Sequence, residues 1–221
     1  GNIYVTIAKK KIFGDVGIDM LAGPSEILVV ADKKNNPDWI AADLLSQAEH
    51  DVNSRSILIT NNSLFGREVL KSISVILKSL PRAKIASQSW KKNGAIIILK
   101  NFSNVHKIIN EISPEHLELA IDKPEFLLDK IQNAGSIFLG KYTPEAIGDY
   151  VAGPNHVLPT GGFTKSLSGI SVASFQKTIS VQEITKKGLG NLSNDIVRLA
   201  RAEGLEAHAK AVEVRMSKNE Y

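Results

Sequence analysis

Gln47 and His50 stand at the end of a predicted helix over residues 37–50, which follows Asn36. Because the two are three residues apart, they would share one face of that helix, with Cβ atoms about 5–6 Å apart. An amide oxygen and a neutral imidazole nitrogen can both bind a metal ion. The alternative is a polar helix end whose histidine interacts with the last carbonyl groups, and these two residues alone favour that alternative.

A second polar stretch, Ser113-Pro114-Glu115-His116, lies between a predicted helix and a predicted strand. A carboxylate beside an imidazole, in a loop at the edge of a sheet, is a candidate acid–base pair. The alternative is a simple turn with a surface histidine.

A third stretch runs from Gly148 to His156 and places Asp149, Asn155 and His156 between glycines. So many functional groups on so constrained a backbone indicate a functional loop, the alternative being an ordinary Gly/Pro/Asn turn. A fourth stretch, in the C-terminal helices, holds Glu203 and His208. A lone histidine on a helix is usually structural or exposed.

The elements that must position these residues alternate between strands and helices, which indicates an α/β domain with a largely parallel sheet. In such sheets ligands bind beyond the carboxyl ends of the strands, so we expect the site there. No G-x-G-x-x-G and no Walker loop occurs, so a self-contained dinucleotide site is not visible. The predicted strands are 27–31, 56–60, 95–99, 117–121 and 136–140, and the predicted helices, after a short one ending at residue 11, are 37–50, 64–80, 83–92, 102–112 and 124–134.

Three segments are predicted: a turn-rich linker over residues 1–26, the α/β domain over 27–170, and a helical arm over 171–221. The arm has an extended stretch at 174–181 and helices at about 191–203 and 205–217. Two short helices bury little apolar surface, so we expect the arm to pack on the main domain or on a partner chain. The chain begins without Met and on a helical pattern, so we expect that the N-terminal part of a longer protein is missing.

Composition narrows the possible functions. The 221 residues are 43% hydrophobic and include no apolar run of 18, so no membrane span is expected. Nothing resembles a signal peptide, which predicts a cytoplasmic protein. Without cysteine, any metal must be bound by histidine, carboxylate or amide groups. The net charge of +4 comes from scattered lysines, which indicate a solvated surface and no nucleic-acid binding.

Together the four stretches resemble the histidinol dehydrogenase family, which acts in the last steps of histidine biosynthesis. The resemblance covers all 221 residues and matches the C-terminal half of the family's full-length chain. It implies a Rossmann-like sheet that is incomplete here because the N-terminal half, with much of the nucleotide-binding domain, is absent. The motifs that carry it are Ile18-Asp19-x-x-Ala22-Gly23-Pro24-Ser25-Glu26, Asp43-Leu44-Leu45-Ser46-Gln47-Ala48-Glu49-His50, Ser113-Pro114-Glu115-His116, Gly148-Asp149-Tyr150 and Asn155-His156-Val157-Leu158-Pro159-Thr160.

The resemblance also implies roles for individual residues. Glu115 and His116 are similar to the family's catalytic pair, and Asn2 falls where the family places an NAD contact. The implied zinc ligands are Gln47, His50, Asp149 and His208. The implied substrate-contacting residues are these four ligands together with Ser25, His116, His156 and Glu203.

The reaction implied by the resemblance is the four-electron oxidation of L-histidinol to L-histidine through histidinal, with two NAD⁺ and one zinc site. The family forms a homodimer with exchanged C-terminal arms, so Glu203 and His208 would complete the partner's site. A non-catalytic zinc- or imidazole-binding dimerisation module is the main alternative. A zinc hydrolase is weakly supported, since no H-E-x-x-H occurs.

Overall fold

The computed structural model describes residues 3–217. The chain divides into two compact units, Gly1–Gln176 and Lys177–Tyr221, and each is described by itself. The predicted arm, residues 171–221, overlaps the second unit. Among the residues described, no helix is long and apolar enough to cross a bilayer.

The described part of the first unit contains a five-stranded sheet in which every pairing is parallel. β1 is central, and all six of its residues are buried, as expected for an apolar run covered on both faces. The predicted α/β fold with a parallel sheet is therefore confirmed. Across the sheet the strands lie in the order β3 (Gly94–Ile98), β2 (Arg55–Thr60), β1 (Glu26–Ala31), β4 (His116–Ala120) and β5 (Ser136–Leu139).

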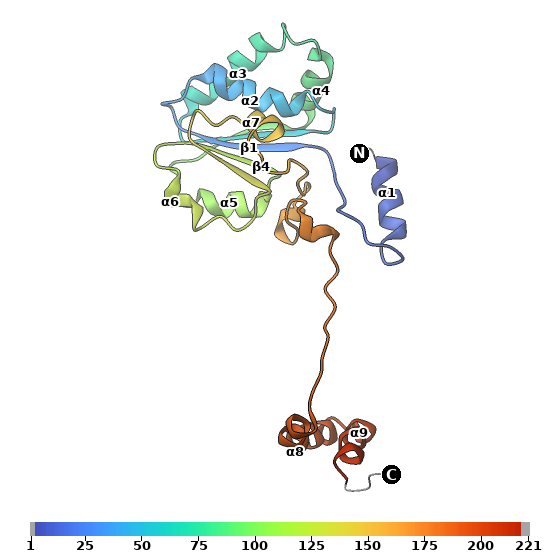
Figure 1. Ribbon diagram of the computed structural model, residues 1–221. Coiled ribbons are helices and arrows are strands. Elements are labelled where there is room, and N and C mark those ends of the chain that lie inside the picture. The colour runs from blue at the N-terminus through green and yellow to red at the C-terminus, as the bar shows by residue number, and fades with distance from the viewer. Residues whose placement is uncertain (1–2, 218–221) are drawn as a thin grey trace. The chain divides into compact units, whose positions relative to one another are not determined.

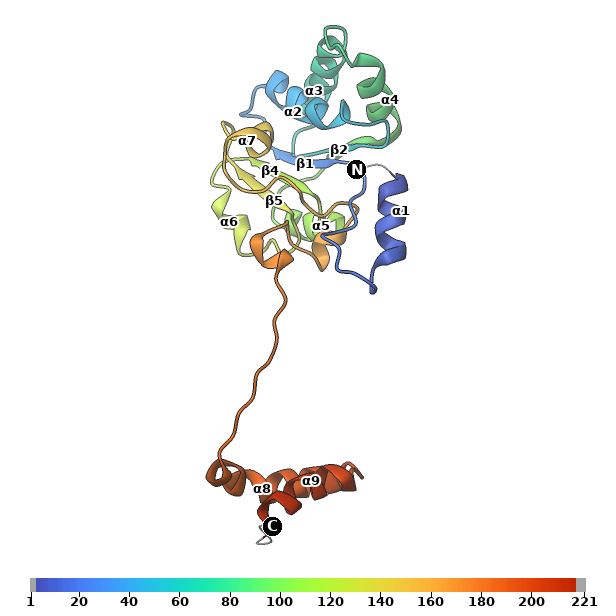
Figure 2. The same cartoon turned by 45° about the vertical axis from the view of Figure 1, so that its right-hand side comes forward.

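Helices cover both faces of this sheet (Figures 1 and 2). One face carries α2 (Pro37–Ala48), α3 (Ser63–Ile76) and α4 (Ala83–Asn93), and the other carries α5 (Val105–Ile112) and α6 (Glu125–Leu128). The remaining helices of the first unit are α1 (Ile3–Ile12), α7 (Ala146–Tyr150) and two 3-10 turns, Phe163–Lys165 and Val172–Phe175.

The alternation of side chains along β1 separates two apolar cores. Ile27 and Val29 pack with α2 residues such as Leu44, while Leu28 and Val30 pack against the α5 side. On β4 the same alternation sends His116 and Glu118 toward α2, because they pair with Ile27 and Val29. His116, a candidate acid–base residue on β4, therefore faces α2, the helix that carries the candidate metal ligand Gln47.

Several predicted elements differ from the structure. The helix predicted over 124–134 is only α6, because the backbone N–H groups of Gln132 and Asn133 donate to the Asn110 side chain instead of continuing a helix. α7 was not predicted. The helix predicted from residue 191 begins earlier as α8 (Lys186–Ala202), where Thr185 caps it by accepting from the Gly188 N–H. Glycines in its first turns weakened the helical signal.

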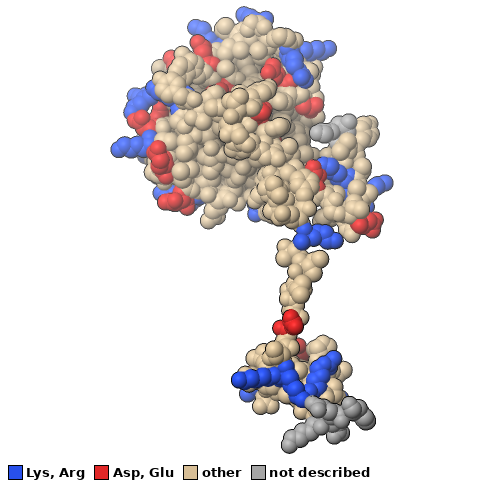
Figure 3. All heavy atoms as spheres, viewed as in Figure 1, with Lys and Arg blue, Asp and Glu red and all other residues tan. Residues whose placement is uncertain are grey.

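The second unit consists of α8 and α9 (Glu206–Met216), joined through Gly204 at φ +76°. Ala200, Ala209 and Val212 are buried. Arg201 forms ion pairs with acidic residues of α9, while Leu192, Leu199, Leu205 and Val214 stay exposed. Figure 3 shows lysines and arginines interspersed with aspartates and glutamates on the visible face of the first unit. The absence of nucleic-acid binding stays a prediction.

Candidate active and metal site

The candidate residues of the first unit meet at the amino edge of the sheet, where β1 and β4 begin. Ser25 directly precedes β1, and Glu115 directly precedes His116, the first residue of β4. Gln47 lies in the last turn of α2, and His50 lies in the turn that leads toward β2. Our expectation of a site beyond the carboxyl ends of the strands is therefore wrong for this pocket. Its polar residues lie at the amino ends of β1 and β4.

A pocket of about 400 Å³ opens at this edge. α7 contributes two of its lining residues, Asp149 and the exposed Tyr150. Every substrate, metal and acid–base residue that was predicted within the first unit lines it. The full lining is Ser25, Gln47, His50, Glu115, His116, Asp149, Tyr150 and His156.

The side chain of Gln47 is 1% exposed, and neither its Oε1 nor its Nε2 makes a well-formed hydrogen bond within the described residues, although the amide interacts with the carboxyl group of Glu145. Leaving a buried amide unpaired costs about 1–3 kcal/mol, so native proteins rarely tolerate one without a ligand or an ion. This poorly paired amide, in a pocket that also holds His50 and Asp149, fits a metal ion bound through nitrogen and oxygen atoms.

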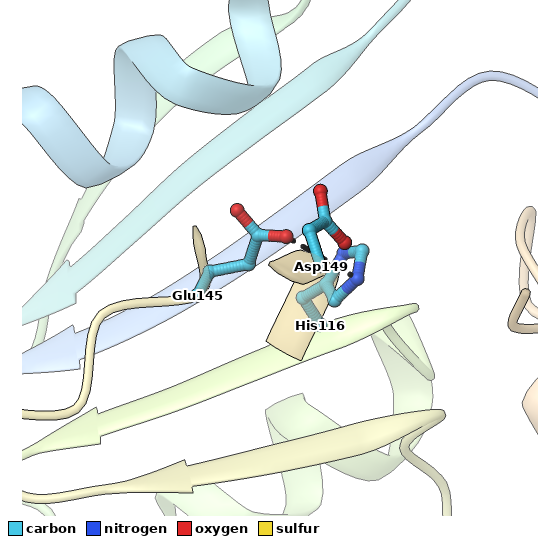
Figure 4. Close-up of side chains that lie close together, drawn as sticks. All are labelled: His116, Glu145 and Asp149. Carbon is cyan, nitrogen blue, oxygen red and sulfur yellow. Dashed lines mark ion pairs between the residues drawn. The ribbon is translucent and has the colours of Figure 1, made fainter. Parts of the chain in front are cut away.

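The ring of His116 has a defined tautomer. Its Nδ1 lies 3.0 Å from the carbonyl oxygen of Glu26, which can only accept, so Nδ1 carries the proton. Nε2 therefore presents its lone pair, and it lies 3.5 Å from Oε1 of Glu145 (Figure 4). Burial lowers the pKa of His116, so the ring is neutral near pH 7 and can accept a proton at Nε2.

Glu115 is held beside this ring. Its Oε2 accepts a hydrogen bond from the Glu26 N–H at 2.9 Å and lies 3.6 Å from Nδ1 of His116. Burial raises the pKa of Glu115 to about 8, with the negative charges of Glu26 and Glu145 adding to the effect. The carboxyl group is thus mostly protonated at neutral pH and becomes a base in mildly alkaline solution.

Glu145 is a site residue that sequence reasoning missed. It is 1% exposed, and burial raises its pKa to about 7. His116, Glu145 and Asp149 each offer one ligand atom, and these atoms all lie within 4.8 Å of one another. Figure 4 shows both carboxylates turned toward the imidazole ring. The only sign of Glu145 in the sequence was the pair Pro144-Glu145, which commonly begins a helix and does not by itself indicate a functional residue.

The remaining predicted residues lie elsewhere in the chain. Glu203 caps the C-terminus of α8, and His208 lies in the first turn of α9, both exposed in the second unit. Asn2, the predicted NAD contact, lies outside the described residues. Three of the four predicted metal ligands therefore share the pocket, and the placement of the fourth stays a prediction.

Amide, imidazole and carboxylate ligands beside a buried acid–base pair, in an α/β fold, are what a metal-assisted enzyme needs. Comparison with known proteins gives the particular family: its profile, described as histidinol dehydrogenase, matches residues 1–216. The chain belongs to the histidinol dehydrogenase family, which confirms the resemblance noted from the sequence.

Individual relatives agree. Histidinol dehydrogenase 1 of Nostoc sp. is 52% identical over 216 residues, which are 98% of this chain and 50% of the relative. The histidinol dehydrogenase of Rhizobium meliloti is 50% identical over 220 residues, 100% of this chain and 51% of the relative. A crystal structure of histidinol dehydrogenase from Elizabethkingia anophelis superposes with a TM-score of 0.90 at 47% identity, covering 98% of this chain and 50% of that one. The chain thus spans about half the length of the curated relatives it matches.

Proposed function

We propose that this chain carries the zinc-binding and acid–base part of an NAD-dependent histidinol dehydrogenase, which oxidises L-histidinol to L-histidine through histidinal. The observation that carries the proposal is the convergence of Gln47, His50 and Asp149 on the pocket that also holds Glu115 and His116. These residues come from three separate parts of the sequence, and the pocket is their common feature.

When bound, zinc would supply a Lewis acid that fixes the imidazole and amine of the substrate, and NAD⁺ would accept the hydride. In the first oxidation, Nε2 of His116 takes the hydroxyl proton as the hydride leaves the alcohol carbon. The hydrogen bond from Nδ1 to the Glu26 carbonyl keeps the required lone pair on Nε2. Burial keeps the ring neutral and ready to accept that proton.

In the second oxidation, the aldehyde must be hydrated before another hydride can leave. Glu115 takes a proton from the attacking water, which it can do once its own carboxyl group is ionised. Its hydrogen bond from the Glu26 N–H fixes the position of Oε2. Because two side chains with different pKa values stand next to each other, one pocket can serve both steps.

The proposed site includes Glu203 and His208 from a second copy of the chain, through exchanged arms. The exposed apolar side chains of the second unit support this arrangement, since Leu192, Leu199, Leu205 and Val214 stay exposed among the described residues of that unit. The histidine would provide the fourth zinc ligand, and the glutamate would contact the substrate.

The test uses the chain alone and the chain fused to the remaining half of a relative such as the Nostoc protein. We expect one zinc per chain by atomic absorption, and two NADH formed per L-histidinol in the fusion. A fusion that binds zinc and histidinol by calorimetry but forms no NADH would refute the reaction. That result would favour the alternative, a non-catalytic module that binds zinc or an imidazole ligand.

A further inference from the structure

Glu26 is the first residue of the central strand β1, which lies between β2 and β4. It pairs with Arg55 of β2, and the next residue, Ile27, pairs with His116 of β4. At this position its main chain and its side chain bind different segments of the chain.

The main chain of Glu26 holds both candidate acid–base side chains. Its N–H donates to Oε2 of Glu115 at 2.9 Å, and its carbonyl oxygen accepts from Nδ1 of His116 at 3.0 Å. Both partners are side chains, so the main-chain N–H and carbonyl groups of Glu26 set the orientation of Glu115 and His116. Because both groups belong to the main chain, every residue except proline supplies them at this position.

The side chain of Glu26 holds a different segment. It is 5% exposed, and its Oε1 accepts from the Gly161 N–H at 2.8 Å. Gly161 has φ +64°, a left-handed conformation that turns its N–H toward the carboxylate. Next to it, the Thr160 hydroxyl accepts from the Gly23 N–H. The segment that follows His156 is therefore hydrogen-bonded to Glu26, whose main chain also binds the side chains of Glu115 and His116.

The other partner of the carboxylate contributes less. Oε2 lies 3.9 Å from a guanidinium nitrogen of Arg55, whose side chain is 61% exposed. An ion pair with so exposed a partner is screened by water and contributes little. The closest contact of this buried carboxylate is therefore the Gly161 N–H, and the N–H groups of Gly162 and Glu115 also stabilise it.

We propose that Glu26 is a positioning residue of the pocket: its main chain orients Glu115 and His116, while its buried carboxylate anchors the 157–162 loop and so places His156 opposite them. The kinetic part of this inference rests on the proposed function, whereas the anchoring part does not. Residues on two sides of the pocket are thereby positioned by one residue that does not itself line the pocket.

The test compares Glu26→Ala, which keeps the main-chain bonds and loses the anchor, with Glu26→Gln, which keeps an oxygen acceptor for Gly161. Arg55→Gln is the control for the ion pair. By NMR, we expect the Gly161 amide in the Ala variant to exchange about tenfold or more faster relative to core amides of β4. The Gln and Arg55 variants should match the wild type. Equal acceleration of Gly161 and the core amides, or no change in either, would overturn the anchoring.

In the fusion with the remaining half of a relative, we expect KM for L-histidinol to rise about tenfold in Glu26→Ala, with a smaller fall in kcat, because the acid–base pair keeps its main-chain partners. The Glu26→Gln variant should have the same KM as the wild-type fusion. A fall in kcat with unchanged KM would refute the placement of His156 by this anchor. If the wild-type fusion forms no NADH, the proposed function fails, while the exchange rates still decide whether Glu26 anchors the loop.

Discussion

The carboxyl groups of Asp43 on α2 and Glu118 on β4 share a hydrogen bond in the interior of the first unit. Glu118 is 1% exposed, and burial together with the Asp43 charge raises its pKa well above the usual range. The pair therefore keeps a proton at neutral pH. Asp43 lies one helical turn before Gln47, and Glu118 lies two residues after His116, so this bond ties the two elements together beneath the pocket.

The first prediction concerns the pH dependence of stability. The folded-state pKa of Glu118 is raised above its unfolded value, so the folded chain binds an extra proton between about pH 4.5 and the folded pKa. The stability that this proton contributes is complete below the unfolded pKa and is lost as pH rises. In Glu118→Gln, the amide N–H can donate to Asp43 and does not titrate. We therefore expect the decline of the unfolding free energy between pH 5 and 8 to flatten, by up to about 1.4 kcal/mol per pH unit.

Urea unfolding of the wild type and the variant across this pH range measures the effect. Glu125→Gln, on the exposed surface of α6, makes the same chemical change and should leave the slope unaltered. Parallel slopes for the wild type and Glu118→Gln would contradict a buried proton on this pair.

The second prediction is that Gln47→Leu has opposite effects on stability and on metal binding. The variant removes a buried amide that makes no well-formed hydrogen bond among the described residues, so the metal-free chain should become more stable by about 1 kcal/mol. Zinc affinity should fall, since one ligand is lost. Urea unfolding in chelator and zinc calorimetry measure the two effects separately. If the metal-free variant is less stable, as after an ordinary core substitution, then the amide has a structural partner and the proposed ligand role fails.

The clustering of polar groups at short spacing marked Gln47, His50, Glu115 and His116 as candidates, and the resemblance to the family gave them their predicted roles. The fold was equally accessible, since buried parallel strands leave apolar runs between amphipathic helices. These are local signals, and a single sequence carries them well.

What the sequence could not supply is the meeting of residues far apart in the chain. Glu118 interrupts an apolar strand and Glu26 directly precedes an apolar run, and these charges were the available signals. The bonds of Glu26 reach Glu115 and Gly161, which only the parallel register and the left-handed loop bring near. The choice of the amino edge over the carboxyl edge depends in the same way on the assembled sheet.

The third prediction separates the two acid–base residues. Burial raises the pKa of Glu115 to about 8, so the fraction able to activate water increases as pH rises through that value. In the fusion with the remaining half of a relative, kcat should therefore rise between pH 7 and 9. Glu115→Gln should remove this rise and lower kcat by about 10²–10⁴. A pH–rate profile for each protein gives the comparison, and an unchanged alkaline limb in Glu115→Gln would assign the base to another group.

The last prediction concerns arm exchange, which mixed dimers can test without any turnover. A chain with His50→Ala lacks a ligand in its pocket, and a chain with His208→Ala lacks one in its arm. If arms are exchanged, the pocket of the second chain and the arm of the first form one intact site in each mixed dimer. Random reassociation of equal amounts makes half of the dimers mixed, so about a quarter of the wild-type zinc sites should return.

The measurement is tightly bound zinc after joint unfolding and refolding in excess metal, followed by gel filtration. Each variant refolded alone is the control, and both should bind zinc weakly, because a three-ligand site loses the constraint of the fourth. If the arm instead docks on its own chain, neither member of a mixed dimer has a complete ligand set, and mixing restores nothing. Zinc content therefore separates the two arrangements even if the isolated chain has no enzymatic activity.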